Sequence, residues 1–229
     1  MSEAESPIAV TFDLFGTLVS AQRPADPAAA VAAELRERGV PVPEDWQELY
    51  ATPHVQIEPG RELSLPAHVR AALETTGGAP GSPTQTGEQN GSESEEDVIR
   101  TAVRAAFDQR VSRRDGAVTA IEAATDLGRV GVLSNCSVPG LVDRTIERVG
   151  LDGRFDAVLA SVDVGYRKPD RRAFQAAADR LDVDPTDLVH VGDDPETDGG
   201  LEDIGGTVIL LDDVPLSGIP DRLSEVGCR

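Results

Sequence analysis

The 229-residue sequence is poor in basic, aromatic and cysteine residues. Its 41 acidic residues against 21 basic ones give a formal net charge of -20, and aromatic residues make up only 3%. Such a surface repels the phosphates of nucleic acids and anionic lipids, so we expect neither a nucleic acid nor a membrane as partner. Cys136 and Cys228 provide no disulfide framework and no spacing typical of a metal site.

Long apolar runs are also missing. No stretch approaches the ~20 residues that a membrane span requires. The short polar start, from Met1 to Pro7, does not resemble a signal peptide. We therefore expect a soluble, cytoplasmic protein, and nothing in the sequence indicates its oligomeric state.

Lysine is almost absent, because Lys168 is the only one and every other basic residue is arginine. One cause is adaptation to concentrated salt, where solvated carboxylates maintain solubility and ions screen charge over about 3 Å at 1 M salt. The other possible cause of the missing lysine is high-GC codon usage, which favours arginine. Under either cause, one retained lysine indicates a task that arginine cannot perform.

Short β-rich runs alternate with helical segments along most of the chain. Strands are expected at 8–12, 130–134, 155–160, 188–191 and 207–211, and helices at 117–127, 139–149, 169–181 and after Pro195. This alternation predicts an α/β fold, a Rossmann-like parallel sheet with helices on both faces. Active groups in such folds lie at the carboxyl ends of strands. Those ends carry Asp13, Ser134 and Asp193, with Lys168 in a nearby loop.

The segment after the first strand has a different character. Helices are expected at 28–38, after the capping pair Asp26-Pro27, and at 97–110, while 44–75 is mixed and partly helical. From about Thr75 to Glu96 the sequence is rich in Gly, Ser, Thr, Pro and Glu without apolar periodicity. That composition predicts a disordered loop.

Four motifs, in this order, resemble those of the haloacid dehalogenase-like hydrolase superfamily. They are FDLFGTL at 12–18, LSN at 133–135, GYRKPD at 165–170 and VGDDPETD at 191–198. The resemblance covers most of the chain outside 20–115. It implies a core domain made of residues 1–19 and 116–229, with residues 20–115 inserted as a helical cap over the site.

The resemblance also implies roles for individual residues. Asp13 would be the nucleophile, forming an aspartyl-phosphate that water later hydrolyses. Ser134 and Lys168 would complete the catalytic set, with the compact ammonium placed between the carboxylate and the phosphoryl group. Thr17, Ser134, Asn135 and Lys168 would bind the substrate, a small phosphorylated molecule.

Mg²⁺ is the implied cofactor. The expected metal residues are Asp13, Asp193, Asp198 and the backbone carbonyl of Phe15, because Mg²⁺ prefers oxygen ligands and keeps several waters. Asp198 would lie in an outer position, near Lys168 or a metal-bound water. Asp194 precedes a proline, and it reads equally well as the cap of the next helix.

Phe15 is a departure from the pattern of the superfamily's phosphatases, which usually carry a second aspartate there. That aspartate protonates the leaving oxygen, and such assistance is worth roughly 10²–10⁴ in rate. Three interpretations stay open. The chain is a phosphatase whose substrate needs little protonation or takes a proton from a cap residue such as His54. It is a 2-haloacid dehalogenase, whose relatives carry an aromatic residue here and dispense with metal. Or it binds a phosphorylated ligand without turnover. The acidic cluster around Asp193 favours the phosphatase.

Overall fold

A parallel sheet of five strands, in the order β5-β4-β1-β6-β7, forms the centre of the protein. The computed structural model describes residues 8–75 and 94–227. The strands are β1 (Ile8–Phe12), β4 (Gly128–Ser134), β5 (Ala157–Ala160), β6 (Leu188–Gly192) and β7 (Thr207–Leu210). The predicted α/β fold is therefore confirmed, and each expected strand is present.

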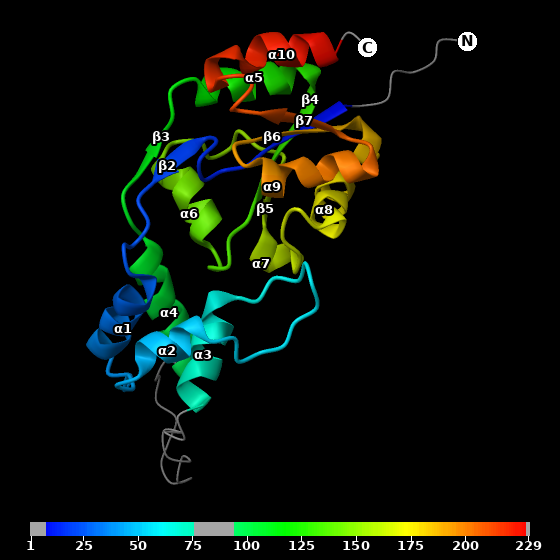
Figure 1. Ribbon diagram of the computed structural model, residues 1–229. Helices are drawn as coiled ribbons and strands as arrows, with labels where there is room; N and C mark the ends of the chain where they lie inside the picture. The colour runs from blue at the N-terminus through cyan, green and yellow to red at the C-terminus, as the bar shows by residue number, and fades with distance from the viewer. Residues whose placement is uncertain (1–7, 76–93, 228–229) are drawn as a thin grey trace.

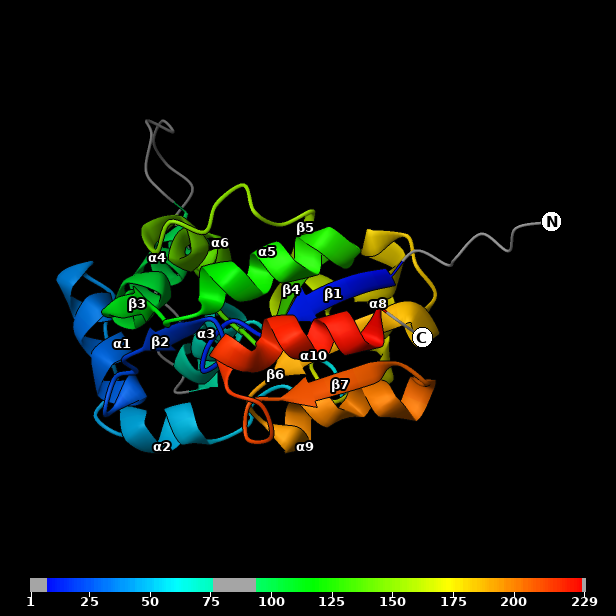
Figure 2. The ribbon, with the colours of Figure 1, turned by 90° about the horizontal axis from the view of Figure 1, so that it is seen from above.

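Helices cover both faces of this sheet (Figure 1). Helices α5 (Ala117–Leu127) and α10 (Ile219–Val226) lie side by side over one face, which Figure 2 shows from above. Helix α8 (Arg171–Leu181) packs on the other face. Alternation along β1 explains both layers, because Val10 and Phe12 join the core with α5 and α10, whereas Ala9 joins the core with α8. Thr11 follows Ala9 by two residues and so faces α8.

Shorter elements complete this part of the chain. They are α6 (Leu141–Arg148), α7 (Ser161–Val164), α9 (Pro195–Asp198) and three 3₁₀ turns at 185–187, 199–204 and 216–218. Helix α9 confirms the short helix expected after Pro195. Among the described residues, no helix has the length and apolar character needed to cross a membrane.

Four further helices form a group at one end of the sheet (Figure 1). They are α1 (Pro27–Glu37), α2 (Trp46–Ala51), α3 (Leu65–Thr75) and α4 (Glu95–Phe107), with α4 packed against α1 and α3. The chain enters and leaves through β2 (Val19–Ala21) and β3 (Val111–Arg113), an antiparallel pair too short to give a sequence signal. This helical content agrees with the division into a core and a cap at 20–115, which we retain as a proposal.

The ends of the loop predicted at 75–96 are helical in the structure. Thr75 is the last residue of α3, and α4 begins at Glu95. The Ser94 hydroxyl accepts a hydrogen bond from the Asp97 amide at 3.2 Å, and three acidic residues occupy the first turn. Carboxylates stabilise the amino end of a helix, so a composition typical of disorder also suits a helix start. Residues 76–93, the rest of that prediction, lie outside the described residues.

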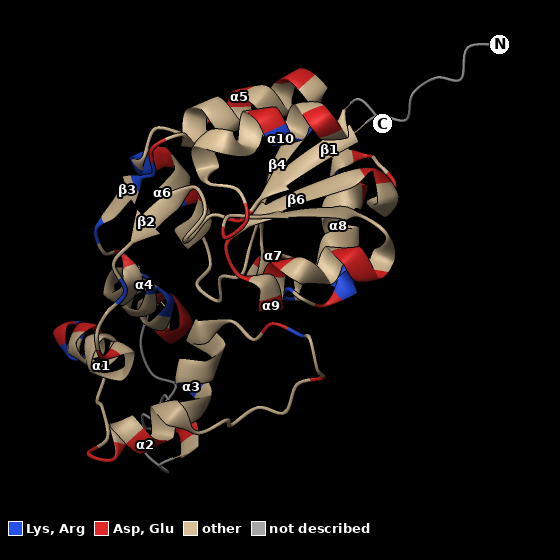
Figure 3. Cartoon of the chain, turned by 45° about the horizontal axis from the view of Figure 1, so that its top comes forward, with Lys and Arg blue, Asp and Glu red and all other residues tan. Residues whose placement is uncertain are grey.

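The acidic residues are distributed over nearly all the helices (Figure 3). We expect the melting temperature to rise by about 4 °C between 0.1 and 2 M KCl, since screening relieves the repulsion of a chain with net charge -20. Thermal unfolding followed by circular dichroism over a KCl series measures this. A melting temperature that stays flat or falls would remove the salt-adaptation hypothesis.

Candidate active site

Asp13, just after β1, and Lys168, in the loop before α8, meet at the carboxyl edge of the sheet. The Lys168 ammonium donates to Asp13 Oδ1 at 2.9 Å and to Asp198 Oδ1 at 2.5 Å. All three residues are buried, with Lys168 only 2% exposed. The structure thus brings together two residues from separate motifs, the predicted nucleophile Asp13 and the predicted lysine Lys168, in one buried chain of ion pairs.

Negative charge is in excess around this lysine. Burial raises the pKa of the Asp13 carboxyl, Lys168 opposes that effect, and the charges of Asp198 and Asp193 reinforce it. For Asp198, burial is outweighed by the hydrogen bond from His190 and the charge of Lys168, which hold its pKa below the usual range. Two carboxylates therefore share one ammonium and Asp193 adds a third negative charge beside Asp13, so these groups lack positive charge for an anionic substrate.

Asp193 is positioned by the turn that follows Asp13. The Thr17 hydroxyl donates to Asp193 Oδ1 at 2.8 Å. Gly16 has a φ of 101°, and a β-carbon there would lie 2.2 Å from Asp193 Oδ2, so only glycine allows this approach. Arg114 donates to the Gly16 carbonyl and ties down the same turn. Thr17 was predicted to bind substrate, whereas in the structure its hydroxyl holds Asp193.

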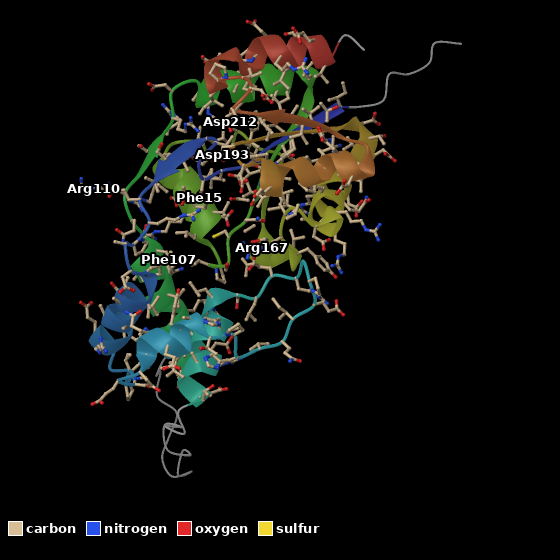
Figure 4. The ribbon with its side chains drawn as sticks, viewed as in Figure 1. Phe15, Phe107, Arg110, Arg167, Asp193 and Asp212 are labelled. Carbon is tan, nitrogen blue, oxygen red and sulfur yellow. The ribbon has the colours of Figure 1, made fainter. Side chains whose placement is uncertain are left out.

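Phe15 lies in the same turn, and Figure 4 shows it between the sheet and the four-helix group. Its side chain is partly buried against the main hydrophobic core. The position two residues after Asp13 therefore presents an aromatic ring and no carboxyl group. Its backbone carbonyl remains a candidate oxygen ligand.

The donor set around Asp13 fits Mg²⁺ as an open site. Within residues 8–75 and 94–227, no group of three or more His, Cys, Asp or Glu side chains could enclose a metal. Two carboxylates, Asp13 and Asp193, with the Phe15 carbonyl would leave the other positions to water and substrate, as Mg²⁺ prefers. Both oxygens of Asp198 already accept hydrogen bonds, from Lys168 and His190 and from the Asp194 amide at 3.0 Å. We therefore leave Asp198 out of the proposed ligand set.

Ser134, the last residue of β4, carries an unpaired hydroxyl. The residue is 1% exposed, and its Oγ is the only buried side-chain oxygen or nitrogen without a hydrogen-bond partner in the described part of the chain. A buried polar group without a partner costs roughly 1–3 kcal/mol. Such an atom at the carboxyl edge of the sheet is available to a substrate oxygen, and the binding role of Ser134 stays a prediction.

Asn135 was predicted to bind substrate, and the structure pairs its amide with the backbone of Lys168. Asn135 Nδ2 donates to the Lys168 carbonyl at 2.9 Å, and the Lys168 amide donates to Asn135 Oδ1 at 2.8 Å. These two hydrogen bonds fix the loop that carries the lysine. In the structure Asn135 therefore positions Lys168.

His190 and Thr11 belong to the site and were not singled out in the sequence. His190 Nε2 lies 3.2 Å from Lys168 Nζ and 3.1 Å from Asp198 Oδ1, and Nδ1 lies 2.9 Å from Thr11 Oγ1. Burial, followed by the charge of Lys168, lowers the pKa of His190 to about 4, so the ring is neutral at pH 7. The sequence did contain a signal for Thr11. It stands two residues before Asp13, and side chains two residues apart in a strand lie on the same face of the sheet.

Three other residues weighed in the sequence analysis have side chains that make none of these contacts: Asp194, His54 and Cys136. Asp194 caps α9, accepting from the amide two residues on at 3.0 Å, which confirms the capping interpretation. His54 bonds to the Leu49 carbonyl at 2.7 Å and Thr75 Oγ1 at 3.2 Å, so both ring nitrogens have partners within the four-helix group. Burial raises the pKa of the Cys136 thiol to about 11, so it is no nucleophile at neutral pH.

The loop between α2 and α3 reaches back to the segment before Lys168, a contact that sequence gave no sign of (Figure 1). The Glu62 amide donates to the Gly165 carbonyl at 3.0 Å, and the Arg167 amide donates to the Gly60 carbonyl at 2.9 Å. The Ser161 hydroxyl also donates to the Glu62 carboxylate at 2.5 Å. The four-helix group is thereby joined directly to the loop that carries the lysine.

Comparison with known proteins places this geometry in a family. Residues 9–205 match the haloacid dehalogenase-like hydrolase family. Two relatives are each 32% identical: the pyrimidine 5'-nucleotidase YjjG of Escherichia coli over 89 residues and phosphatase MT3486 of Mycobacterium tuberculosis over 111. These alignments span 38% and 47% of this chain and only 39% and 51% of the relatives.

Among solved structures, a 2-haloacid dehalogenase from Pseudomonas syringae pv. Tomato superposes with a TM-score of 0.67. It is 24% identical, and the match covers 96% of this chain and 99% of that one. This likeness is one of fold. The family match covers most of the chain and agrees with the four motifs identified in the sequence. The protein is thus a member of the haloacid dehalogenase-like hydrolases.

Proposed function

We propose that this hydrolase is a Mg²⁺-dependent phosphatase, which acts on a small phosphorylated molecule through an aspartyl-phosphate at Asp13. The observation that carries the proposal is the charge balance of the site. Asp13 and Asp198 pair with the single ammonium of Lys168, and Asp193 adds a further negative charge close enough to raise the pKa of Asp13, so negative charge exceeds positive charge among these groups. A divalent cation offsets that excess and allows a phosphate dianion to approach.

The chain's own groups divide the reaction between them. A carboxylate oxygen of Asp13 attacks phosphorus, the ester P–O bond breaks, and the leaving oxygen carries away the electron pair. Water then hydrolyses the aspartyl-phosphate and regenerates Asp13. Lys168 and the unpaired Ser134 hydroxyl bind the transferring oxygens. Mg²⁺, held by Asp13, Asp193 and the Phe15 carbonyl, would neutralise the charge on those oxygens.

The relatives support the choice of a phosphate ester. One is named a nucleotidase and the other a phosphatase, and each alignment covers about half or less of the relative. We therefore extend to this chain only the class of bond broken, a phosphate ester of a small molecule.

Phe15 favours a second candidate, a metal-independent 2-haloacid dehalogenase. A halide leaves without a proton, so an aromatic ring in place of the acid would cost that reaction nothing. Asp193 weighs against it, because a second carboxylate beside Asp13 would only repel a carboxylate substrate when no metal is bound. We therefore rank the phosphatase first. With no acid at Phe15, it should prefer leaving groups of low pKa, such as aryl or acyl phosphates.

An aryl phosphate in high salt tests this ranking. We expect phosphate release with Mg²⁺ and none with EDTA. Replacing the ligand Asp193→Asn should raise the Mg²⁺ concentration for half-maximal activity about 10–100-fold. Asp194→Asn is the matched control, since the neighbouring carboxylate caps α9 and asparagine caps equally well. Chloride release from 2-chloropropionate without metal would establish the dehalogenase instead. If neither product appears, the phosphatase ranking fails, and the result is the one expected of a protein that binds a phosphorylated ligand without turnover.

A further inference from the structure

Thr11 and His190 form a buried polar pair behind the ion pairs of the site. They are register partners on the parallel strands β1 and β6, and both are 0% exposed. Phe174 of α8 covers the imidazole edge-on, with the ring centroids 5.4 Å apart and the planes at 77°. The ring is therefore held in one plane, with one nitrogen toward Thr11 and the other toward Asp198 and Lys168.

A neutral imidazole carries one N–H, so the contacts of His190 admit two tautomers. With the proton on Nε2, the ring donates to the Asp198 carboxylate at 3.1 Å, and the Thr11 hydroxyl donates to Nδ1 at 2.9 Å. With the proton on Nδ1, the Thr11 hydroxyl must turn to the Val189 carbonyl at 3.4 Å. Nε2 would then carry no proton, and its lone pair would face the negatively charged carboxylate of Asp198. The first tautomer gives a charge-assisted bond and the shorter hydroxyl bond, so it has the lower energy.

The choice of tautomer decides what Lys168 does with its third N–H. Two of its hydrogens go to Asp13 at 2.9 Å and Asp198 at 2.5 Å. If His190 Nε2 were a bare acceptor, it would take the third at 3.2 Å. A protonated Nε2 cannot accept, so the third N–H is kept for another group.

We propose that Thr11 and His190 are positioning residues that hold the Nε2–H tautomer, steady Asp198, and reserve one N–H of Lys168 for the transferring group. The proposal deepens the function proposed above and rests on it in one respect, the role of Lys168 toward the substrate. Neither residue touches the reacting atoms in this scheme. Both act through Asp198 and Lys168.

Nitrogen NMR of the histidine-labelled native chain tests the tautomer without reference to activity. The chain has three histidines, and the signals of His190 are identified by their loss in His190→Gln. We expect a protonated Nε2 and an unprotonated Nδ1 at pH 7. An Nδ1–H signal from His190 would overturn the proposal, whether or not the protein hydrolyses phosphate.

A matched pair of amides tests the positioning role by kinetics. The side-chain nitrogen of glutamine reaches the place of Nε2, whereas that of asparagine reaches only the place of Nδ1. We expect His190→Asn to lower kcat about 10–100-fold with KM within twofold, and His190→Gln to recover most of that loss. Thr11→Ser should likewise retain the activity that Thr11→Val loses.

Each outcome has a distinct meaning. Equal losses in the two His190 variants, or a change confined to KM, would overturn the proposal. Melting temperatures identify a variant that fails to fold, and the NMR measurement on the native chain then decides. If the native chain releases no phosphate at all, the function proposed above fails, while the tautomer measurement still tests the pair.

Discussion

Replacing the proposed nucleophile by Asp13→Asn should abolish phosphate release, with a loss on the order of 10⁴ or more in kcat. The amide has nearly the shape of the carboxylate and cannot form the covalent intermediate. Its melting temperature should not fall. Asp13 is buried beside two other carboxylates, and Lys168 keeps Asp198 as a partner after the change. The variant is therefore expected to lose its activity and to keep its stability.

Asp126→Asn is the matched control, because it makes the same chemical change at an exposed position of α5. It should leave both kcat and the melting temperature unchanged. An Asp13→Asn protein that retained more than about a hundredth of the native kcat would contradict the nucleophilic role. Trapping supplies a second measurement, since a brief reaction with labelled phosphate ester should label the native chain and not the variant.

The sequence predicted the fold well because its signals are local. Short apolar runs alternate with capped helices, and that alternation alone determines a parallel sheet with its active groups at one edge. Asp13 and Ser134 were therefore found as residues at strand ends. Lys168 was found in a loop near those ends, and it stood out further as the single lysine in a chain whose other basic residues are arginine.

The partners of the site residues were less predictable. Asn135 bonds to a backbone 33 residues away, and Thr17 bonds to a carboxylate 176 residues away. A hydrogen-bonding side chain in a motif needs a partner. Whether that partner is the substrate or another part of the protein is determined only by the fold. The substrate-binding roles of Thr17 and Asn135 therefore stay predictions, to which the structure adds contacts within the protein.

His190 was missed for a further reason. It stands in the run Leu188-Val-His-Val-Gly192, in which every residue is buried. A lone histidine in such a run is typical of a satisfied core residue. What distinguishes it is its register opposite Thr11 and the approach of Lys168 from a separate loop. Both features depend on the pairing of β1 with β6, which local sequence does not specify.

Lys168→Arg should lower kcat by about 10³, although it conserves the charge. The lysine side chain is 1% exposed, and its nitrogen lies within 3.2 Å of Asp13, Asp198 and His190. A guanidinium is broad and planar, and it cannot place one compact charge between these groups. Steady-state kinetics with an aryl phosphate measures the loss, and circular dichroism shows whether the fold is retained.

The reverse exchange at the surface is the matched control for this prediction. Arg180→Lys, at an exposed position in the last turn of α8, should change neither kcat nor the melting temperature. Lys168→Met provides the second comparison, because it leaves buried carboxylates without their cation and should cost about 3–5 kcal/mol in unfolding free energy. If Lys168→Arg kept a third or more of the native kcat, the single lysine would have no task that arginine cannot perform. Its retention in an arginine-rich chain would then need a cause outside the active site.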